Sequence, residues 1–170
     1  MLLVKDKAGR PVRELGINRD ITEQRQFRQR YLMLFERSPD AFLLVDDASG
    51  TLDAANEAAC RLFAGTRLQL PGLNLLRISS PLQPDGTPSS EAILPIIAIC
   101  RQQGYHQFEW VHRRLTGSDF WAEVTVQTLQ LDGRLSAFVA LRDITTRKQL
   151  ESDLRAAREA AEQASFAKGK

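Results

Sequence analysis

Few side chains in this sequence have the type and spacing that chemistry requires. His112 alternates with Phe108 and Trp110 in FEWVH, so the three share one face of an expected strand. We expect His112 to lie at the edge of the core and to bond backbone or water; a polar group in a ligand pocket is the alternative. Turn formation explains the acidic pair Asp46–Asp47. The sequence contains no GxSxG, HExxH or glycine-rich phosphate loop, so this chain is not expected to be an enzyme.

The cysteines and the charge exclude further classes. Cys60 and Cys100 lie far apart without CxxC spacing, so neither a metal site nor a disulfide is expected, and both should be free thiols in a reducing cytoplasm. The net charge of +2 is too small to indicate a nucleic-acid partner. No secretory signal or membrane-spanning run is recognisable, which favours a cytoplasmic location, although the parent protein could be membrane-anchored outside this segment.

A four-residue repeat divides the chain. Arg-Asp-Ile-Thr occurs at 19–22 and again at 142–145, each time after an extended stretch and before a charged, helix-like run. An Asp at such a junction can accept hydrogen bonds from the free N–H groups of the first helical turn. Each copy is therefore interpreted as the end of a sheet followed by a helix. The predicted organisation is the tail of an earlier domain (1–19), a connecting helix (20–37), one complete domain (38–145) and an outgoing helix (146–170).

The complete domain has an α+β pattern. AFLLVDDASGTLDAAN predicts a hairpin, and Asn56 is a suitable cap for a short helix that Gly65 closes. An irregular, Pro- and Gly-rich segment follows, and then a helix from Glu91 to Gln103, in which Pro95 either lies in the first turn or kinks the helix. Three further strands complete the pattern. We expect a five-stranded antiparallel sheet with helices on one face, flanked by N- and C-terminal helices.

The order of these segments resembles a PAS sensory domain. SPDAFLLVDDASGTLDAANEAACRLFAG, FEWVHRRLTGSDFWAEVTV and FVALRDIT carry the resemblance across residues 38–145, and residues 4–22 resemble the closing strands of a preceding PAS domain. The resemblance implies an input module of a bacterial signalling protein, in which Asp143, Ile144 and Thr145 link the last strand to the outgoing helix. A two-component sensor histidine kinase with a phosphorelay, hybrid and with tandem PAS domains, is the expected parent. The alternatives are a protein-interaction module without a ligand and the input domain of a diguanylate cyclase.

The resemblance also implies a small-molecule pocket between sheet and helices. No particular ligand is indicated. Haem is not expected, because the helix that supplies a ligand histidine in haem-binding PAS domains reads EAILPIIAICRQQ here. A LOV-type flavin adduct is not expected either, because Leu75 stands where the reactive cysteine would be. The candidate pocket residues are Leu44, Asn56, Ile93, Ile97, Cys100, Phe108, Trp110, His112, Val124 and Phe138.

The outgoing helix carries a heptad pattern. Its apolar positions are spaced four, three and four residues apart, which is typical of a coiled-coil seam. We expect a homodimer through the flanking helices, followed in the parent chain by a kinase output domain; a solvated linker helix is the alternative. The expected dimer seam consists of Leu150, Leu154, Ala157 and Ala161.

Overall fold

The computed structural model describes residues 2–5, 11–15, 22–131 and 133–168. The chain divides into two compact units, Met1–Leu34 and Phe35–Lys170. In the first unit, β1 (Leu2–Lys5) pairs antiparallel with β2 (Pro11–Leu15). Helix α1 (Thr22–Arg37) follows in the sequence. Of the first Arg-Asp-Ile-Thr copy, the residues before Thr22 lie outside the described residues.

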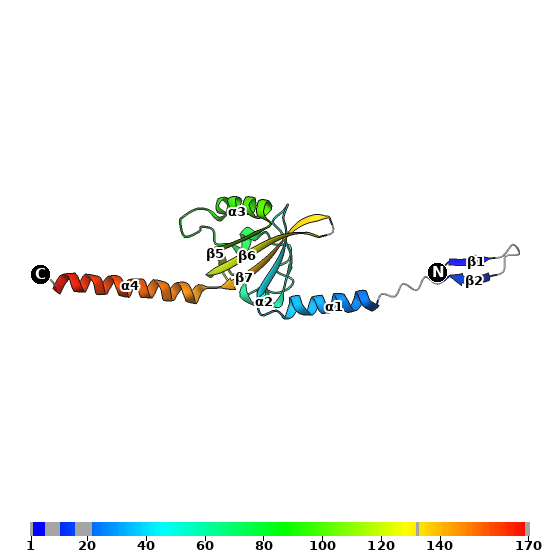
Figure 1. Cartoon of the computed structure of the whole chain (residues 1–170), viewed down its shortest axis with the longest axis horizontal. Coiled ribbons are helices and arrows are strands. Elements are labelled where there is room, and N and C mark those ends of the chain that lie inside the picture. Colours follow the sequence, from blue (N-terminus) through cyan, green and yellow to red (C-terminus); the bar gives the residue numbers. More distant parts are fainter. Residues whose placement is uncertain (1, 6–10, 16–21, 132, 169–170) are drawn as a thin grey trace. The chain divides into compact units, whose positions relative to one another are not determined.

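The second unit is built on the predicted sheet (Figure 1). Its five strands are arranged in the order β4-β3-β7-β6-β5, and every neighbouring pair is antiparallel, which confirms the expected fold class. The first two and last three strands in sequence thus meet where β3 pairs with β7. The strands are β3 (Ala41–Asp46), β4 (Leu52–Ala55), β5 (Tyr105–Arg113), β6 (Asp119–Leu131) and β7 (Arg134–Asp143).

Helices connect the two groups of strands. They are α2 (Glu57–Leu62), the 3-10 helix η1 (Leu75–Ile78) and α3 (Ser89–Gln103), and α4 (Thr145–Lys168) leaves the sheet after β7. Helix α3 begins two residues before the predicted start, directly after Pro88, whose φ of −56° already suits a helix. Pro95 therefore lies inside α3 and not in its first turn. Gly104 ends α3 with a φ of 75°, a conformation that favours glycine.

One face of the sheet packs against these helices. Alternating residues of β3, β6 and β7, among them Leu43, Val124 and Val139, form a continuous buried core with side chains of α2, η1 and α3. Phe63, which is fully buried, lies edge-on to the rings of Phe120 and His112, with centroids 5.5 Å and 5.4 Å away. This inner face is the one that can enclose a ligand.

The loop after α2 packs closely against the end of β5. A Cβ placed on Gly65 would lie 2.7 Å from Leu115 Cδ1, closer than real contacts allow. The backbone N–H of Leu115 donates to the carbonyl of Phe63 at 2.9 Å. A side chain at Gly65 would thus have to displace the end of the Leu115 side chain. The N–H of Gly65 also donates to the carbonyl of Cys60 at 2.9 Å, at the helix ending predicted for it.

Candidate ligand cavity and signalling junction

A cavity of about 90 Å³ lies between the inner face of the sheet, η1 and α3. Inner-face strand residues such as Leu43, Val126 and Val139 line it together with Leu75, Leu76 and Ile96 of the helices. Most of the predicted pocket residues also line this cavity. They are Ile93, Ile97, Cys100, Phe108, Trp110, His112 and Val124.

Three predicted pocket residues lie elsewhere. Leu44 and Phe138 are cross-strand partners on the outer face, because β3 and β7 alternate and their neighbours Leu43 and Val139 point inward. Phe138 instead packs on Phe42, with ring centroids 5.0 Å apart. Assigning Leu44 and Phe138 to the cavity was therefore wrong. Both faces of the sheet carry apolar residues, and alternation alone does not tell which face is covered.

Asn56, the third exception, holds elements together and does not line the cavity. Its Oδ1 accepts from the backbone N–H groups of Ala59, in α2, and Phe42, in β3, both at 2.9 Å. Its Nδ2 donates to the carbonyls of Phe35 and Asp40, also at 2.9 Å. The predicted cap is present, but the fully buried amide also joins the end of α1, the start of β3 and the start of α2.

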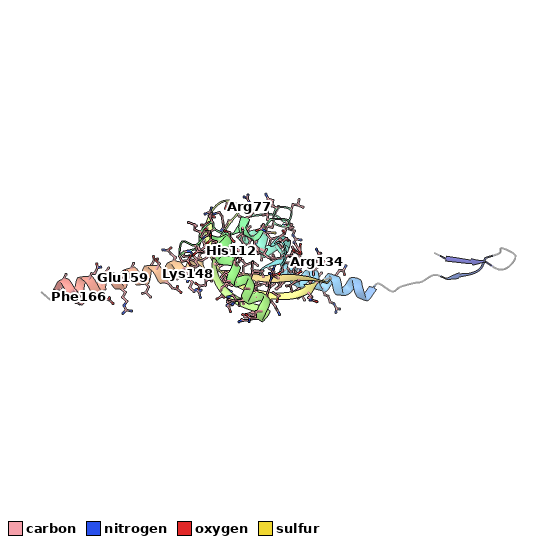
Figure 2. The ribbon with its side chains drawn as sticks, turned by 90° about the horizontal axis from the view of Figure 1, so that it is seen from above. Arg77, His112, Arg134, Lys148, Glu159 and Phe166 are labelled. Carbon is pink, nitrogen blue, oxygen red and sulfur yellow. The ribbon has the colours of Figure 1, made fainter. Side chains whose placement is uncertain are left out.

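His112 is a buried, neutral side chain of the cavity lining (labelled in Figure 2). Its Nδ1 lies 2.9 Å from the carbonyl oxygen of Ile78. Burial lowers the pKa of His112 to about 4, and the hydrogen bond to Ile78 opposes this shift only in part. A neutral imidazole that bonds a carbonyl must carry its proton on Nδ1, so Nε2 is an acceptor. The expected hydrogen bond from His112 to the backbone is present. The side chain is buried more deeply than the expected position at the edge of the core.

A polar network that the sequence did not indicate holds η1, the loop before α3 and β5 together. Trp110 Nε1 donates to Ser79 Oγ at 3.1 Å. Gln83 pairs with the backbone of Val111 in both directions and donates to Ser89 Oγ at 2.7 Å. Ser79, Gln83 and Ser89 are all buried. Short polar residues in a Pro- and Gly-rich segment are typical of exposed loops, so no sequence signal distinguished them.

The junction between β7 and α4 is fixed at several atoms. The N–H of Ile144 donates to the carbonyl of Trp121 at 2.9 Å, and the N–H of Trp121 donates to Thr145 Oγ1 at 3.0 Å. Asp143 Oδ1 accepts from the N–H of Thr145 at 2.9 Å, and the side chain of Ile144 is buried. Strand β6 and the first turn of α4 are therefore bonded directly through this triplet.

Arg114 connects Asp143 to the interior of the domain. Its Nη2 lies 2.9 Å from Asp143 Oδ2, while Nη1 donates to the carbonyl of Leu62 at the end of α2. The guanidinium lies 4.2 Å from the centroid of the Phe120 ring, and that ring stacks on His112 of the cavity lining. Partial burial would raise the pKa of Asp143, but hydrogen bonds from Thr145 and Arg114 outweigh it and lower that pKa, so Asp143 is ionised. A continuous set of contacts thus runs from the cavity to the junction.

Charged side chains also attach the first turn of α4 to the sheet. Glu109 of β5 pairs with Arg147 at 2.7 Å and also with Lys148. Lys148 Nζ lies 4.8 Å from the centre of the Trp121 ring. These exposed pairs are individually weak, but they act on the same turn as Thr145.

Beyond this turn, the apolar side chains of α4 are exposed. Leu150 is 64% exposed and Leu154 is 73% exposed, and no residue of α4 is buried within the chain. Glu159 and Phe166 mark the later part of the helix in Figure 2. The residues predicted for the dimer seam are therefore exposed, as an association surface requires.

The two cysteines are free and buried. Burial raises the pKa of both thiols, so neither is activated as a thiolate. Cys100 lines the cavity, whereas Cys60 lies in α2. Leu75, which stands where a flavin-reactive cysteine would be, is the first residue of η1.

The structure is an α+β domain with a cavity between sheet and helices, and comparison with known families assigns it to a class. The profile described as the PAS domain matches residues 39–146, more than half of the chain. The chain therefore belongs to the PAS domain family, which confirms the resemblance seen in the sequence. PAS domains are sensory modules and not catalysts, and they commonly dimerise and pair with output domains such as kinases.

Solved PAS domains have the same fold. A PAS domain from a two-component sensor histidine kinase is 23% identical, with a TM-score of 0.57 over 72% of this chain and 98% of that one. The PAS domain of an HTR-like protein from Haloarcula marismortui is 21% identical, with a TM-score of 0.62 over 74% and 98%. A PAS domain of a LuxR-family transcriptional regulator from Burkholderia thailandensis, solved in complex with ethanol, is 19% identical, with a TM-score of 0.54 over 67% and 96%.

No curated protein matches the chain. None of the helices that the structure describes combines the length and the apolar character needed to span a bilayer.

Proposed function

We propose that residues 38–145 form the sensory and signal-relay PAS domain of a bacterial two-component sensor histidine kinase. A change caused by a ligand or a partner in the cavity passes through Asp143-Ile144-Thr145 to a dimeric output helix. The observation that carries this proposal is the pair of hydrogen bonds between the backbone of Trp121 and the residues Ile144 and Thr145. In addition, Arg114 connects Asp143 to the end of α2 and to the ring of Phe120. Movement of the inner face of the sheet must therefore act on the first turn of α4.

Several features support the kinase as the output. The PAS domain of a two-component sensor histidine kinase shares the fold over nearly its whole length. The segment AAREAAEQASFAKGK resembles the lead-in to the dimerisation helix of such kinases. The β1–β2 hairpin also supports assigning residues 1–19 to the tail of a preceding PAS domain, as in a tandem, hybrid kinase. Two free, buried thiols support a reducing, cytoplasmic location.

A PAS interaction module that uses no ligand is the second candidate. The volume of about 90 Å³ favours it, because ligand sites commonly span about 300–1,000 Å³. The related fold from Burkholderia thailandensis, solved with ethanol, supports a ligand of very small size instead. Occupancy by small probes distinguishes the two candidates.

Replacing Asp143 with alanine should loosen the junction and leave the domain folded. The N–H of Thr145 loses its side-chain acceptor and Arg114 loses its ion-pair partner, so the first turn of α4 should open about tenfold more often, by the usual cost of a lost cap. Hydrogen exchange of the α4 amides measures this opening. In the parent kinase the same variant should abolish the response to signal.

Asp143→Asn is the matched control, because its amide oxygen can still accept from Thr145 while the charge facing Arg114 is removed. It should give a smaller increase in exchange than alanine. Equal protection of the first turn of α4 in wild type and Asp143→Ala would show that the triplet does not hold the helix.

The α4 seam should mediate dimerisation. We expect Leu150→Lys combined with Leu154→Lys to weaken self-association at least tenfold, because each exposed leucine buries apolar area only in a helix pair. Sedimentation equilibrium measures the dimer dissociation constant. The control is Ser152→Lys with Gln163→Lys, which adds the same charge to α4 off the seam. If both double substitutions weaken the dimer equally, the interface lies elsewhere.

A further inference from the structure

His112 is a buried polar side chain whose hydrogen bonding is incomplete. It is 5% exposed, and no described residue bonds its Nε2. Glu36 Oε2 also lacks a hydrogen bond, but it lies 3.0 Å from Arg67 Nη2 and is paired by charge. An unsatisfied buried acceptor costs about 1–3 kcal/mol, so its presence in a cavity lining requires an explanation.

The direction of Nε2 follows from the other ring nitrogen. Nδ1 bonds the carbonyl of Ile78 in η1, and the two nitrogens of an imidazole point in nearly opposite directions. Phe120 stacks on the ring with centroids 5.7 Å apart, and Phe63 makes a T-shaped contact with it at 5.4 Å. Nε2 is thus the atom through which His112 can meet a molecule in the cavity that it lines.

Most of the other polar groups of the lining are already engaged, and Thr128 carries one further hydroxyl. Asp46 Oδ1 accepts from Ser49, and Asp47 Oδ2 is paired with Arg101 at 2.8 Å. Ser79 Oγ accepts from Trp110 and donates to the carbonyl of Leu75. The lining that the structure describes contains no lysine or arginine, so an anionic ligand would find no countercharge there, and an unpaired charge among its apolar side chains is strongly unfavourable.

We propose that the cavity selects small, neutral molecules that carry one hydroxyl group, which donates its hydrogen bond to Nε2 of His112. The apolar remainder of the ligand packs against Ile97, Val124 and Val139. A cavity of about 150 Å³ accommodates benzene, so about 90 Å³ suits roughly three to five heavy atoms, the size of a short-chain alcohol. This inference rests on the proposed sensory function and adds the chemical class of its ligand.

Two probes of equal size test the hydroxyl requirement. 2-Propanol and acetone have the same number of heavy atoms and similar shapes, but only 2-propanol can donate a hydrogen bond. The ring nitrogens of His112 are observed by 15N NMR, and the methyl groups of Ile97 and Val124 are observed in the same titrations. We expect the proton on Nδ1, an upfield shift of Nε2 with 2-propanol and none with acetone. The methyl groups should respond to both probes, with about fivefold tighter binding of 2-propanol, as one net hydrogen bond provides.

His112→Phe is the matched variant, because a phenyl ring keeps the aromatic contacts to Phe63 and Phe120 but offers no acceptor. It should bind both probes equally. If 2-propanol shifts the methyl groups while Nε2 stays unchanged, or if Nε2 carries the proton, the hydroxyl assignment is wrong and the cavity still binds small molecules. If neither probe shifts the methyl groups, the hydroxyl assignment and the ligand arm of the proposed function both fail.

Discussion

Asn56→Ala is expected to destabilise the PAS domain by about 3–5 kcal/mol. The substitution removes four hydrogen bonds at 2.9 Å and leaves the N–H groups of Phe42 and Ala59 and the carbonyls of Phe35 and Asp40 without this partner. Each buried polar group that loses its partner costs about 1–3 kcal/mol, and partial access of water reduces the sum. Urea unfolding followed by tryptophan fluorescence measures the loss.

Asn74→Ala provides the comparison. Asn74 is also a helix cap, accepting from Leu76 and donating to the carbonyl of Ser49, but it is exposed. Its loss should cost about 1 kcal/mol, as for an ordinary cap. If the two alanine variants unfold at the same urea concentration, Asn56 is only a cap and does not join α1, β3 and α2.

The free energy of unfolding should fall by about 3 kcal/mol between pH 6.5 and pH 4, because of His112. Its pKa is about 4 in the folded domain and near 6.5 when unfolded. Between these values the unfolded chain binds more protons than the folded one, so stability decreases as pH falls; above pH 6.5 this group contributes no pH dependence. Urea unfolding across this range measures the slope.

The groups around His112 leave burial as the main cause of its lowered pKa. Ile78 offers a carbonyl oxygen, and Phe63 and Phe120 offer uncharged rings; the Arg114 guanidinium lies on the Phe120 ring. His112→Phe should remove the contribution of His112, about 3 kcal/mol, from the pH dependence in this window. His106 and the carboxylates are the same in both proteins, so they cancel in the difference. An equal slope in the two proteins would contradict the buried, neutral state of His112.

The sequence indicated the architecture well because local patterns determine it. Alternating apolar strands, turn residues and the Asn56 cap all act over short distances, and the sheet and its helices agree with them. The face of each strand was harder to assign. Phe42 and Phe138 are apolar but lie on the outer face, where Phe42 stacks on Phe35 of α1, with ring centroids 6.3 Å apart. Periodicity distinguishes two faces and does not say what covers each.

The contacts that join distant segments could not be predicted. Asn56 was recognised as a cap, but its bonds to Phe35 and Asp40 depend on how α1 meets β3. Arg114 lies in the turn that connects the adjacent strands β5 and β6, between residues 113 and 119, and this position lets it reach Asp143. The loop residues Ser79 and Gln83 gain their role only from packing on β5. Contacts of this kind depend on the tertiary fold and produce no recognisable spacing pattern in the sequence.

The central claim is that the cavity and α4 are coupled through Asp143-Ile144-Thr145, and amide hydrogen exchange in a mutant cycle tests it most directly. Ile97→Phe adds volume to the cavity lining, and the N–H of Lys148, bonded to the carbonyl of Ile144 at 3.0 Å, reports on the first turn of α4. We predict that Ile97→Phe changes the exchange rate of Lys148 at least threefold, and that Asp143→Ala removes this response while the amides of β6 still respond. An unchanged Lys148 rate in Ile97→Phe, or the same response with and without Asp143, would contradict the coupling.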